Sequence, residues 1–201
     1  MVFVKINKLF VLIGIILFSL LFINLYKDFI KDNSYNKEVS SINGYDYTLN
    51  SSDTKVYKDK FNELNNILSS TSINNKEYAK KIAELFLIDV FTLDNKITST
   101  DIGGLEFIHN DLKEDFKMNM GLTLYKNIES NLDGKRNQKL PAVKNVIVDN
   151  LFETKYIYNG KEYDSYLVNA SIEYEKDMDY QNKIKLTLIN DNNKIYVVKG
   201  E

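Results

Sequence analysis

The chain has 201 residues, of which 26 are basic and 28 acidic, and its formal net charge is −2. This balance excludes the basic surplus of nucleic-acid-binding domains, and it also excludes strong electrostatic attraction to anionic lipid. Cysteine is absent, which excludes disulfides and thiol chemistry.

The first predicted element is an uncharged apolar run over residues 9–26. As a helix, these 18 residues reach roughly 27 Å at about 1.5 Å each, close to the hydrocarbon thickness of a bilayer. The run has no polar face, so we predict a membrane-spanning helix that contacts the lipid bilayer. The residues expected to form this anchor are Leu9, Phe10, Ile13, Ile16, Leu17, Leu20, Leu21, Phe22, Ile23, Leu25 and Tyr26.

The flanks of this run bear on its processing and orientation. The run is longer than the core of a signal peptide and ends without a small-x-small cleavage site, so we expect it to be retained. Lysines are equally frequent on both sides, so the positive-inside rule gives only a slight preference. Since a short basic leader normally stays in the cytoplasm, we expect residues 1–8 inside and residues 27–201 outside the cell membrane.

Residues 27–53 are polar and rich in turn-forming residues, and we interpret them as a tether. Tyr45, Tyr47 and Leu49 alternate within it, which allows a short edge strand. One folded domain is expected over residues 54–201, a length that allows a substantial core.

Two helices are predicted at the start of this domain. The first follows Asp53, its expected N-cap, and the second begins near Asn74, which has capping-box spacing to Glu77. The second helix is apolar nearly all round in its C-terminal half, so we expect it to be buried on more than one side. The apolar residues are Tyr57, Phe61, Leu64 and Leu68 in the first helix, and Ala79, Ile82, Ala83, Leu85, Phe86, Leu87, Ile88, Val90 and Phe91 in the second.

A third helix is predicted from a second capping-box pair, Asp111 and Glu114, to the turn at Asp133-Gly134. The spacing of four residues predicts that one face of this helix is apolar. That face consists of Leu112, Phe116, Met120 and Leu124.

The C-terminal part of the chain changes to a period of two, which predicts antiparallel strands. Residues 143–158 are rich in strand-forming residues, although Asp149 or a bulge interrupts their pattern. Asn159-Gly160 then gives a hairpin-turn signal.

Two further strands are expected over residues 166–175 and 183–188. Glu173 is predicted opposite Lys185, because charges then match on one face and apolar residues on the other.

A turn over residues 190–193 leads to a last strand, with Ile195 beside Leu188. Helices followed by about four antiparallel strands define an α+β domain whose sheet has one packed face.

Three segments carry a resemblance to a known group of proteins. FTLDNKITSTDIGGLEFI (91–108), GKRNQKLPAVKNVIV (134–148) and LTLINDNNKIYVVKG (186–200) resemble membrane-anchored proteins of Gram-positive bacteria with a nuclear transport factor 2-like (cystatin-like) cone. The resemblance covers about residues 54–201 and implies helices cradled by a curved four-stranded sheet, but it assigns no task. The anchor-plus-cone architecture is also similar to the assembly factors of type IV secretion and conjugation machines, although their diagnostic motifs are absent.

The densest group of potential cation ligands lies in residues 101–115. Helix capping and solvent exposure explain these residues better than metal binding, because no DxDxDG-type spacing is present. We therefore predict neither a metal nor a cofactor. The residues considered are Asp101, Glu106, His109, Asp111, Glu114 and Asp115.

Other candidate motifs also lack a catalytic pattern. His109 is the single histidine and has no Gly-x-Ser-x-Gly serine or cysteine to activate, so we expect it on the surface or partly packed. Gly103-Gly104 lacks a phosphate-loop pattern and is expected at a tight helix entry or a close backbone contact. A small basic patch, interpreted as a solvated loop, consists of Lys135, Arg136, Lys139 and Lys144.

Two functional hypotheses remain. The first is a non-enzymatic interaction or scaffold domain that docks another envelope protein. The second is a pocket that binds a small molecule or, less favoured, an enzyme that uses tyrosines and an inward-pointing Asp149, as ketosteroid isomerases use Tyr and Asp. Filling of the space between helices and sheet by Phe86, Val90, Phe116 and Ile172 would contradict the second hypothesis. The tyrosines concerned are Tyr156, Tyr158, Tyr166, Tyr174 and Tyr180.

Overall fold

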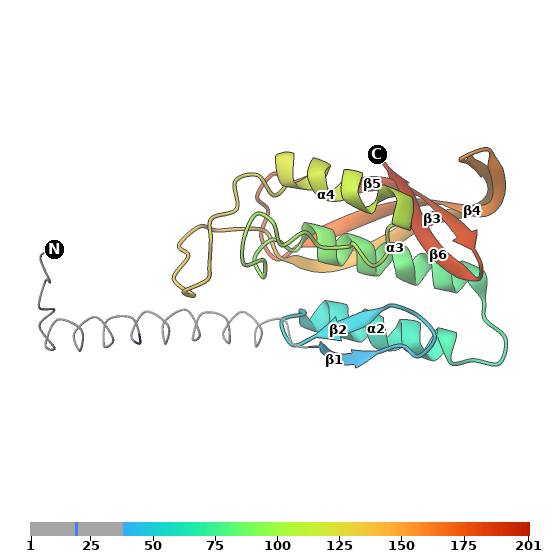
Figure 1. Ribbon diagram of the computed structural model, residues 1–201, viewed down its shortest axis with the longest axis horizontal. Helices are drawn as coiled ribbons and strands as arrows, with labels where there is room; N and C mark the ends of the chain where they lie inside the picture. Colours follow the sequence, from blue (N-terminus) through green and yellow to red (C-terminus); the bar gives the residue numbers. More distant parts are fainter. Residues whose placement is uncertain (1–18, 20–37) are drawn as a thin grey trace, which may run out of the picture. The chain divides into compact units, whose positions relative to one another are not determined.

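The sheet is a four-stranded antiparallel meander in the order β3-β4-β5-β6 (Figure 1). Its strands are β3 (Val143–Tyr158), β4 (Lys161–Tyr174), β5 (Lys183–Asp191) and β6 (Lys194–Gly200). The computed structural model describes Ser19 and residues 38–201. Within residues 38–201, three α-helices precede this sheet, so the predicted α+β class and the helix-first order are confirmed.

The β3–β4 hairpin turns at Asn159 and Gly160, whose φ angles are 50° and 76°. Positive φ at both central residues is typical of a type I′ turn, and the predicted hairpin is confirmed. The register of β3 against β4 shifts between Val148 and Asn150. A bulge at Asp149 therefore accounts for the interrupted pattern of this strand.

β4 and β5 pair in a different register from the predicted one. Asn169, not Glu173, lies opposite Lys185. The displacement from 173 to 169 is four residues, an even number, so every side chain keeps its face of the sheet. The alternating pattern is the same in both registers, which is why it did not distinguish them.

The β5–β6 turn is tighter than predicted. Its central residues are Asn192 and Asn193, with φ angles of 53° and 65°. Val197 therefore lies opposite Leu188, and the predicted position of Ile195 beside Leu188 is wrong. Asparagine adopts positive φ more readily than most residues, which allows two residues to close this hairpin.

Helix α2 (Lys55–Leu68) begins after Thr54, whose hydroxyl oxygen accepts a hydrogen bond from the Tyr57 backbone N–H at 3.3 Å. The predicted N-cap, Asp53, instead accepts a hydrogen bond from the Asn50 backbone N–H at 2.6 Å. The four predicted apolar residues of α2 are buried as expected.

Helix α3 (Asn75–Phe91) is capped as predicted, since the Asn74 side chain accepts hydrogen bonds from the backbone N–H groups of Lys76 and Glu77. The helix lies between α2 and the sheet (Figure 1) and contacts α2, β3, β4 and β6. Its side chains are therefore buried on more than one side. The core beneath it includes Val168 and Ala170 of β4, each 1% exposed.

Helix α4 (Lys113–Leu122) follows a short 3₁₀ turn at Asn110–Leu112. No side chain caps either helical start, so the predicted capping box of Asp111 and Glu114 is wrong.

The helix also ends well before the predicted Gly134. The reason is tertiary: Tyr125 is fully buried, and its hydroxyl donates a hydrogen bond to the Val90 carbonyl at 2.7 Å. This burial overrides the helical pattern of the sequence.

A two-stranded hairpin of β1 (Glu38–Ser41) and β2 (Thr48–Asn50) precedes α2. Tyr47 is fully buried, and its hydroxyl lies 2.6 Å from the Tyr78 hydroxyl on α3. Residues 38–53, which the sequence assigns to the tether, therefore contribute to the hydrophobic core.

Candidate functional site

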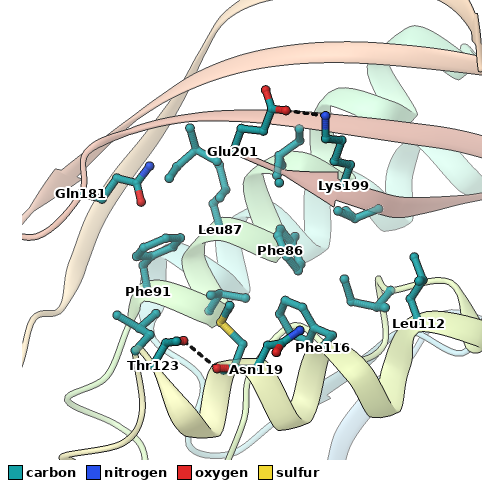
Figure 2. A pocket seen from close by; sticks show the side chains of 18 of the residues that line it. Phe86, Leu87, Phe91, Leu112, Phe116, Asn119, Thr123, Gln181, Lys199 and Glu201 are labelled. Atoms are coloured by element: carbon teal, nitrogen blue, oxygen red, sulfur yellow. Dashed lines mark hydrogen bonds and ion pairs between the residues drawn. The ribbon is translucent and has the colours of Figure 1, made fainter.

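A cleft with a volume of about 670 Å³ lies between α3, α4 and the strands β5 and β6 (Figure 2). The pocket hypothesis fails if Phe86, Val90 and Phe116 fill the space between helices and sheet. They line the walls of the cleft and leave it open. Ile172 is buried in the inner sheet face and does not line the cleft. The apolar lining residues are Phe86, Leu87, Val90, Phe91, Ile108, Leu112, Phe116, Met120, Leu124, Ile184, Leu186, Val197 and Val198.

Helix α4 forms the outer wall of the cleft. None of its residues is buried, although Phe116 and Met120 line the cleft. The Phe116 ring centroid lies 5.8 Å from that of Phe86 on α3. On the opposite side of α4, Met118 is 58% exposed. Residues four positions apart lie on the same side of a helix, so α4 turns Phe116 and Met120 toward the cleft and Met118 toward solvent.

The polar side chains that line the cleft are exposed to solvent, so they form its rim. Asn119 and Thr123 lie on the α4 side, and Gln181, Lys199 and Glu201 lie on the strand side (Figure 2). The Lys199 ammonium contacts the Glu201 carboxylate, and the Thr123 hydroxyl donates a hydrogen bond to the Asn119 carbonyl at 2.6 Å.

The size and lining of the cleft are those of a small-ligand site. Among the described lining residues, no hydrogen bond joins a hydroxyl to a carboxylate. The volume lies within the range of about 300–1,000 Å³ that is usual for small-ligand sites. Burial of apolar surface, at about 25 cal/mol per Å², is the main driving force that such a cleft offers.

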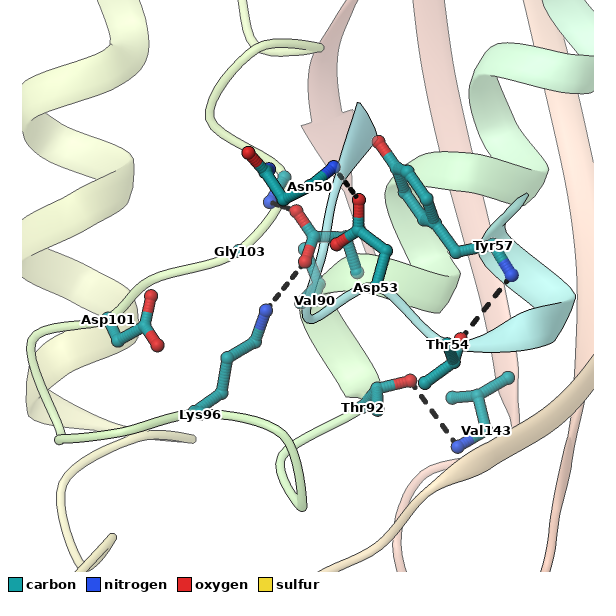
Figure 3. A network of polar contacts seen from close by, with 12 residues as sticks. Asn50, Asp53, Thr54, Tyr57, Val90, Thr92, Lys96, Asp101, Gly103 and Val143 are labelled. Carbon is teal, nitrogen blue, oxygen red and sulfur yellow. Dashed lines mark hydrogen bonds and ion pairs between the residues drawn. The ribbon is translucent and has the colours of Figure 1, made fainter. Parts of the chain in front are cut away.

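An ion pair joins the C-terminal end of α3 to the loop that follows it (Figure 3). Asp89 accepts hydrogen bonds from Lys96 Nζ and from the Gly104 backbone N–H, both at 2.6 Å. Burial lowers the pKa of Lys96, but the adjacent Asp89 charge outweighs this effect and raises it above its usual value. This pair was not predicted from the sequence, although Asp89 is the one charged residue between Leu85 and Phe91 of α3.

The glycine pair packs against the same region of α3. A Cβ atom at Gly103 would clash with the Asp89 carbonyl oxygen, and Gly104 has a φ of 78°. The Gly103 N–H donates a hydrogen bond to the Tyr125 hydroxyl at 3.1 Å. The predicted close backbone contact is confirmed.

A second partly buried carboxylate belongs to Glu106, in the loop before α4. Glu106 accepts hydrogen bonds from the Tyr57 hydroxyl at 2.9 Å and from the backbone N–H and the hydroxyl of Thr48, both at 3.0 Å. Burial raises the pKa of Glu106 to about 7. Burial likewise raises the pKa of Asp53 to about 6.

The acidic stretch does not converge on one point. Asp101 accepts a hydrogen bond from the Ile97 backbone N–H at 3.0 Å, while Glu114 and Asp115 are exposed. Within the part of the chain that the structure describes, no group of three or more histidine and carboxylate side chains is placed to hold a metal.

His109 is partly packed, as predicted, with a side chain that is 13% exposed. Its ring makes edge-to-face contacts with those of Tyr158 and Tyr196, both at a centroid distance of 5.2 Å. Asp111 and Asp191 approach its two ring nitrogens at 3.7 and 3.6 Å. None of these five residues lines the cleft.

The arrangement of Tyr and Asp149 that the enzyme hypothesis required is not formed. Asp149 is exposed at the β3 bulge, where it accepts a hydrogen bond from the Ser171 hydroxyl at 2.6 Å. Of the five tyrosines considered, Tyr180 alone lines the cleft. The predicted inward orientation of Asp149 is therefore wrong, because the bulge turns it toward solvent.

Arg136 does not belong to a solvated basic loop. Its guanidinium donates hydrogen bonds to the carbonyl oxygens of Lys96 and Asp94, both at 2.7 Å, and of Glu129 at 3.3 Å. It therefore joins loops on both sides of α4 in the sequence. The remaining members of the predicted patch, Lys135, Lys139 and Lys144, are exposed.

The predicted anchor over residues 9–26 lies outside the described residues, apart from Ser19. Among the residues that are described, no helix combines the length and apolarity needed to cross a membrane. Comparisons of the chain with protein-family models, curated proteins and solved structures found no match.

Proposed function

We propose that this chain is a membrane-tethered, extracytoplasmic binding protein, without enzymatic activity, whose cleft takes up an apolar ligand. The observation that carries this proposal is the apolar cleft of about 670 Å³ between α3, α4 and the sheet. Its polar groups lie at the mouth, where they give orientation, and its interior offers burial alone.

The wider setting combines this cleft with the apolar run of residues 9–26. The helix-first order and the antiparallel meander support the resemblance to membrane-anchored nuclear transport factor 2-like proteins of Gram-positive bacteria. External protease added to protoplasts tests the orientation. We expect cleavage in the exposed loop over residues 175–182, whereas protection until lysis would contradict an extracytoplasmic domain.

The absence of cysteine gives a direct test of the cleft. A single cysteine is introduced by Met120→Cys inside the cleft, or by Met118→Cys on the outer face of α4, and is labelled with bimane. We expect cyclohexane-saturated buffer to shift the bimane emission at position 120 and not at position 118. Equal responses at both positions would contradict an apolar binding site.

A second function, docking of another envelope protein, is favoured by an apolar group on the outer face of the sheet. Phe152 and Leu167 lie opposite each other on β3 and β4 and are 56% and 44% exposed. Ile147, opposite Ser171, shares this face and is 43% exposed. Exposed apolar clusters on a sheet commonly mark protein interfaces.

In-cell crosslinking of the full chain tests this docking surface. We expect Phe152→Ser to reduce a crosslinked envelope partner strongly, whereas Thr154→Ser on the same strand leaves it unchanged. Failure to trap a partner at native expression, or equal yields from both variants, would contradict the scaffold function.

A further inference from the structure

We infer that the natural occupant of the cleft is the single acyl chain of a membrane amphiphile with an uncharged polar head, such as a monoacylglycerol. This inference rests on the proposed apolar-ligand function and names its ligand class. Three observations carry it: the shape of the cleft, its lining and the charge at its mouth.

The volume limits the shape of the occupant. Three turns of helix, about 10 Å wide and 16 Å long, occupy roughly 1,200 Å³. The cleft holds about 670 Å³, so a partner helix does not enter it. A slender flexible chain fits this space, and it can follow the apolar side chains that continue from α3 to β5 and β6.

The lining favours hydrocarbon over a polar ligand. Phe86, Leu87 and Phe91 present aromatic and aliphatic surface from α3, and Leu186 and Val197 continue it on the sheet. A polar ligand buried there would lose hydrogen bonds to water without replacement, at a cost of about 1–3 kcal/mol per group. An acyl chain loses none, and each buried methylene gains about 0.8 kcal/mol.

The charged residues at the rim of the cleft limit the kind of polar head group that the occupant can carry. Lys199 is the one cation among the described lining residues, and its ammonium already contacts Glu201. Asp115 adds a second carboxylate to the rim. A carboxylate or phosphate head would therefore meet net negative charge, whereas hydroxyl groups match the amides of Asn119 and Gln181.

The test uses the full chain in phospholipid nanodiscs that contain a monooleoylglycerol analogue with a diazirine in its acyl chain. After illumination, peptide mass spectrometry locates the crosslinks. We expect labelling of α4 and of β5 and β6 in the cleft. Met120→Trp should reduce it at least about fivefold by filling the space, and the matched variant Met118→Trp should leave it unchanged.

A second arm uses the diazirine analogue of oleic acid, which has the same chain and a carboxylate head. Like charge at the mouth should make its labelling about fivefold weaker. Equal or stronger labelling by the fatty acid would overturn the head-group assignment. Thr123→Trp serves as a second blocking variant, and native circular dichroism confirms that each variant is folded.

The two levels of the proposal fail in distinguishable ways. If cyclohexane alters the bimane at position 120 but monooleoylglycerol does not label the cleft, the apolar-ligand function stands and the acyl-chain inference is overturned. If neither probe responds to the cleft, both are overturned.

Discussion

The Glu106 carboxylate accepts a hydrogen bond from the Tyr57 hydroxyl at 2.9 Å, across 49 positions of the sequence. The same carboxylate accepts two hydrogen bonds from Thr48. The Glu106 side chain thus joins β2, α2 and the loop before α4, and it holds the β1–β2 hairpin to the domain. Burial raises the pKa of this carboxyl group to about 7.

This contact predicts a pH dependence of stability. The pKa of Glu106 is about 7 in the folded chain, against an ordinary value of 4.5. Because the folded state binds a proton that the unfolded state has released, this contribution is complete below about pH 4.5 and is lost as pH rises through 7. We expect the free energy of unfolding of the wild type, relative to Glu106→Gln, to fall by about 2–3 kcal/mol between pH 4.5 and 8.

Urea denaturation across this pH range measures the difference. Asp53, whose pKa is also raised, contributes in the same direction to both proteins, so comparing the two proteins removes most of its effect. Parallel pH profiles for wild type and Glu106→Gln would show that Glu106 is not the titrating group.

A second prediction concerns Tyr47, whose burial anchors the β1–β2 hairpin in the hydrophobic core. Its hydroxyl lies 2.6 Å from the Tyr78 hydroxyl and donates to the Ile195 carbonyl at 3.2 Å. Tyr47→Phe removes the hydrogen bonds to both buried partners, so we expect the free energy of unfolding, measured by chemical denaturation, to fall by about 1–3 kcal/mol. Tyr45→Phe, a half-buried neighbour, is the control and should cost less than 0.5 kcal/mol, roughly the effect of a surface change. Equal effects would indicate that the hairpin is not docked.

Two glycines should respond oppositely to alanine. A Cβ at Gly103 meets the Asp89 carbonyl oxygen, so Gly103→Ala should destabilise the domain by about 2 kcal/mol or more. Gly121 lies in α4 with no atom within 4 Å of such a Cβ, so Gly121→Ala should stabilise it by about 0.5–1 kcal/mol. Thermal denaturation compares them, and a tolerated Gly103→Ala would contradict the close packing of this loop on α3.

We predict that the Arg136 guanidinium stabilises the loops before and after α4 by donating several hydrogen bonds at once. Arg136→Lys keeps the charge but loses the simultaneous bonds to Lys96 and Asp94, so we expect a loss of about 1–2 kcal/mol. Lys139→Ala, at an exposed neighbour, should change stability by less than about 0.5 kcal/mol. If Arg136→Lys left the free energy of unfolding unchanged, charge alone would matter, and the proposed role of the two hydrogen bonds would be contradicted.

The elements that the sequence predicts well are those with a clear period. The buried face of α2 and the cap at Asn74 follow from local spacing, and so does the Asn159-Gly160 turn. The β4–β5 register does not, because an even displacement leaves each face unchanged. The end of α4 depends on the burial of Tyr125 against a distant helix, which no local pattern expresses.

The candidate site was less predictable than the fold. Phe86, Phe116 and Met120 follow the expected apolar spacing, but periodicity gives the direction of a side chain and not whether space remains beyond it. The Asp89–Lys96 pair had one signal, a charge within an apolar helix. Its partner comes from a loop whose path the sequence does not specify.

The most direct test of the central claim is the ¹³C-methyl spectrum of the methionines under xenon pressure, because xenon occupies apolar cavities. The chain has four methionines, Met1, Met118, Met120 and Met178, which keeps assignment simple. An open apolar cleft predicts that the Met120 methyl resonance shifts with xenon pressure while that of Met118, on the outer face of the same helix, does not. A Met120 resonance that stays unmoved, or that shifts no more than Met118, would contradict the cleft as a ligand site.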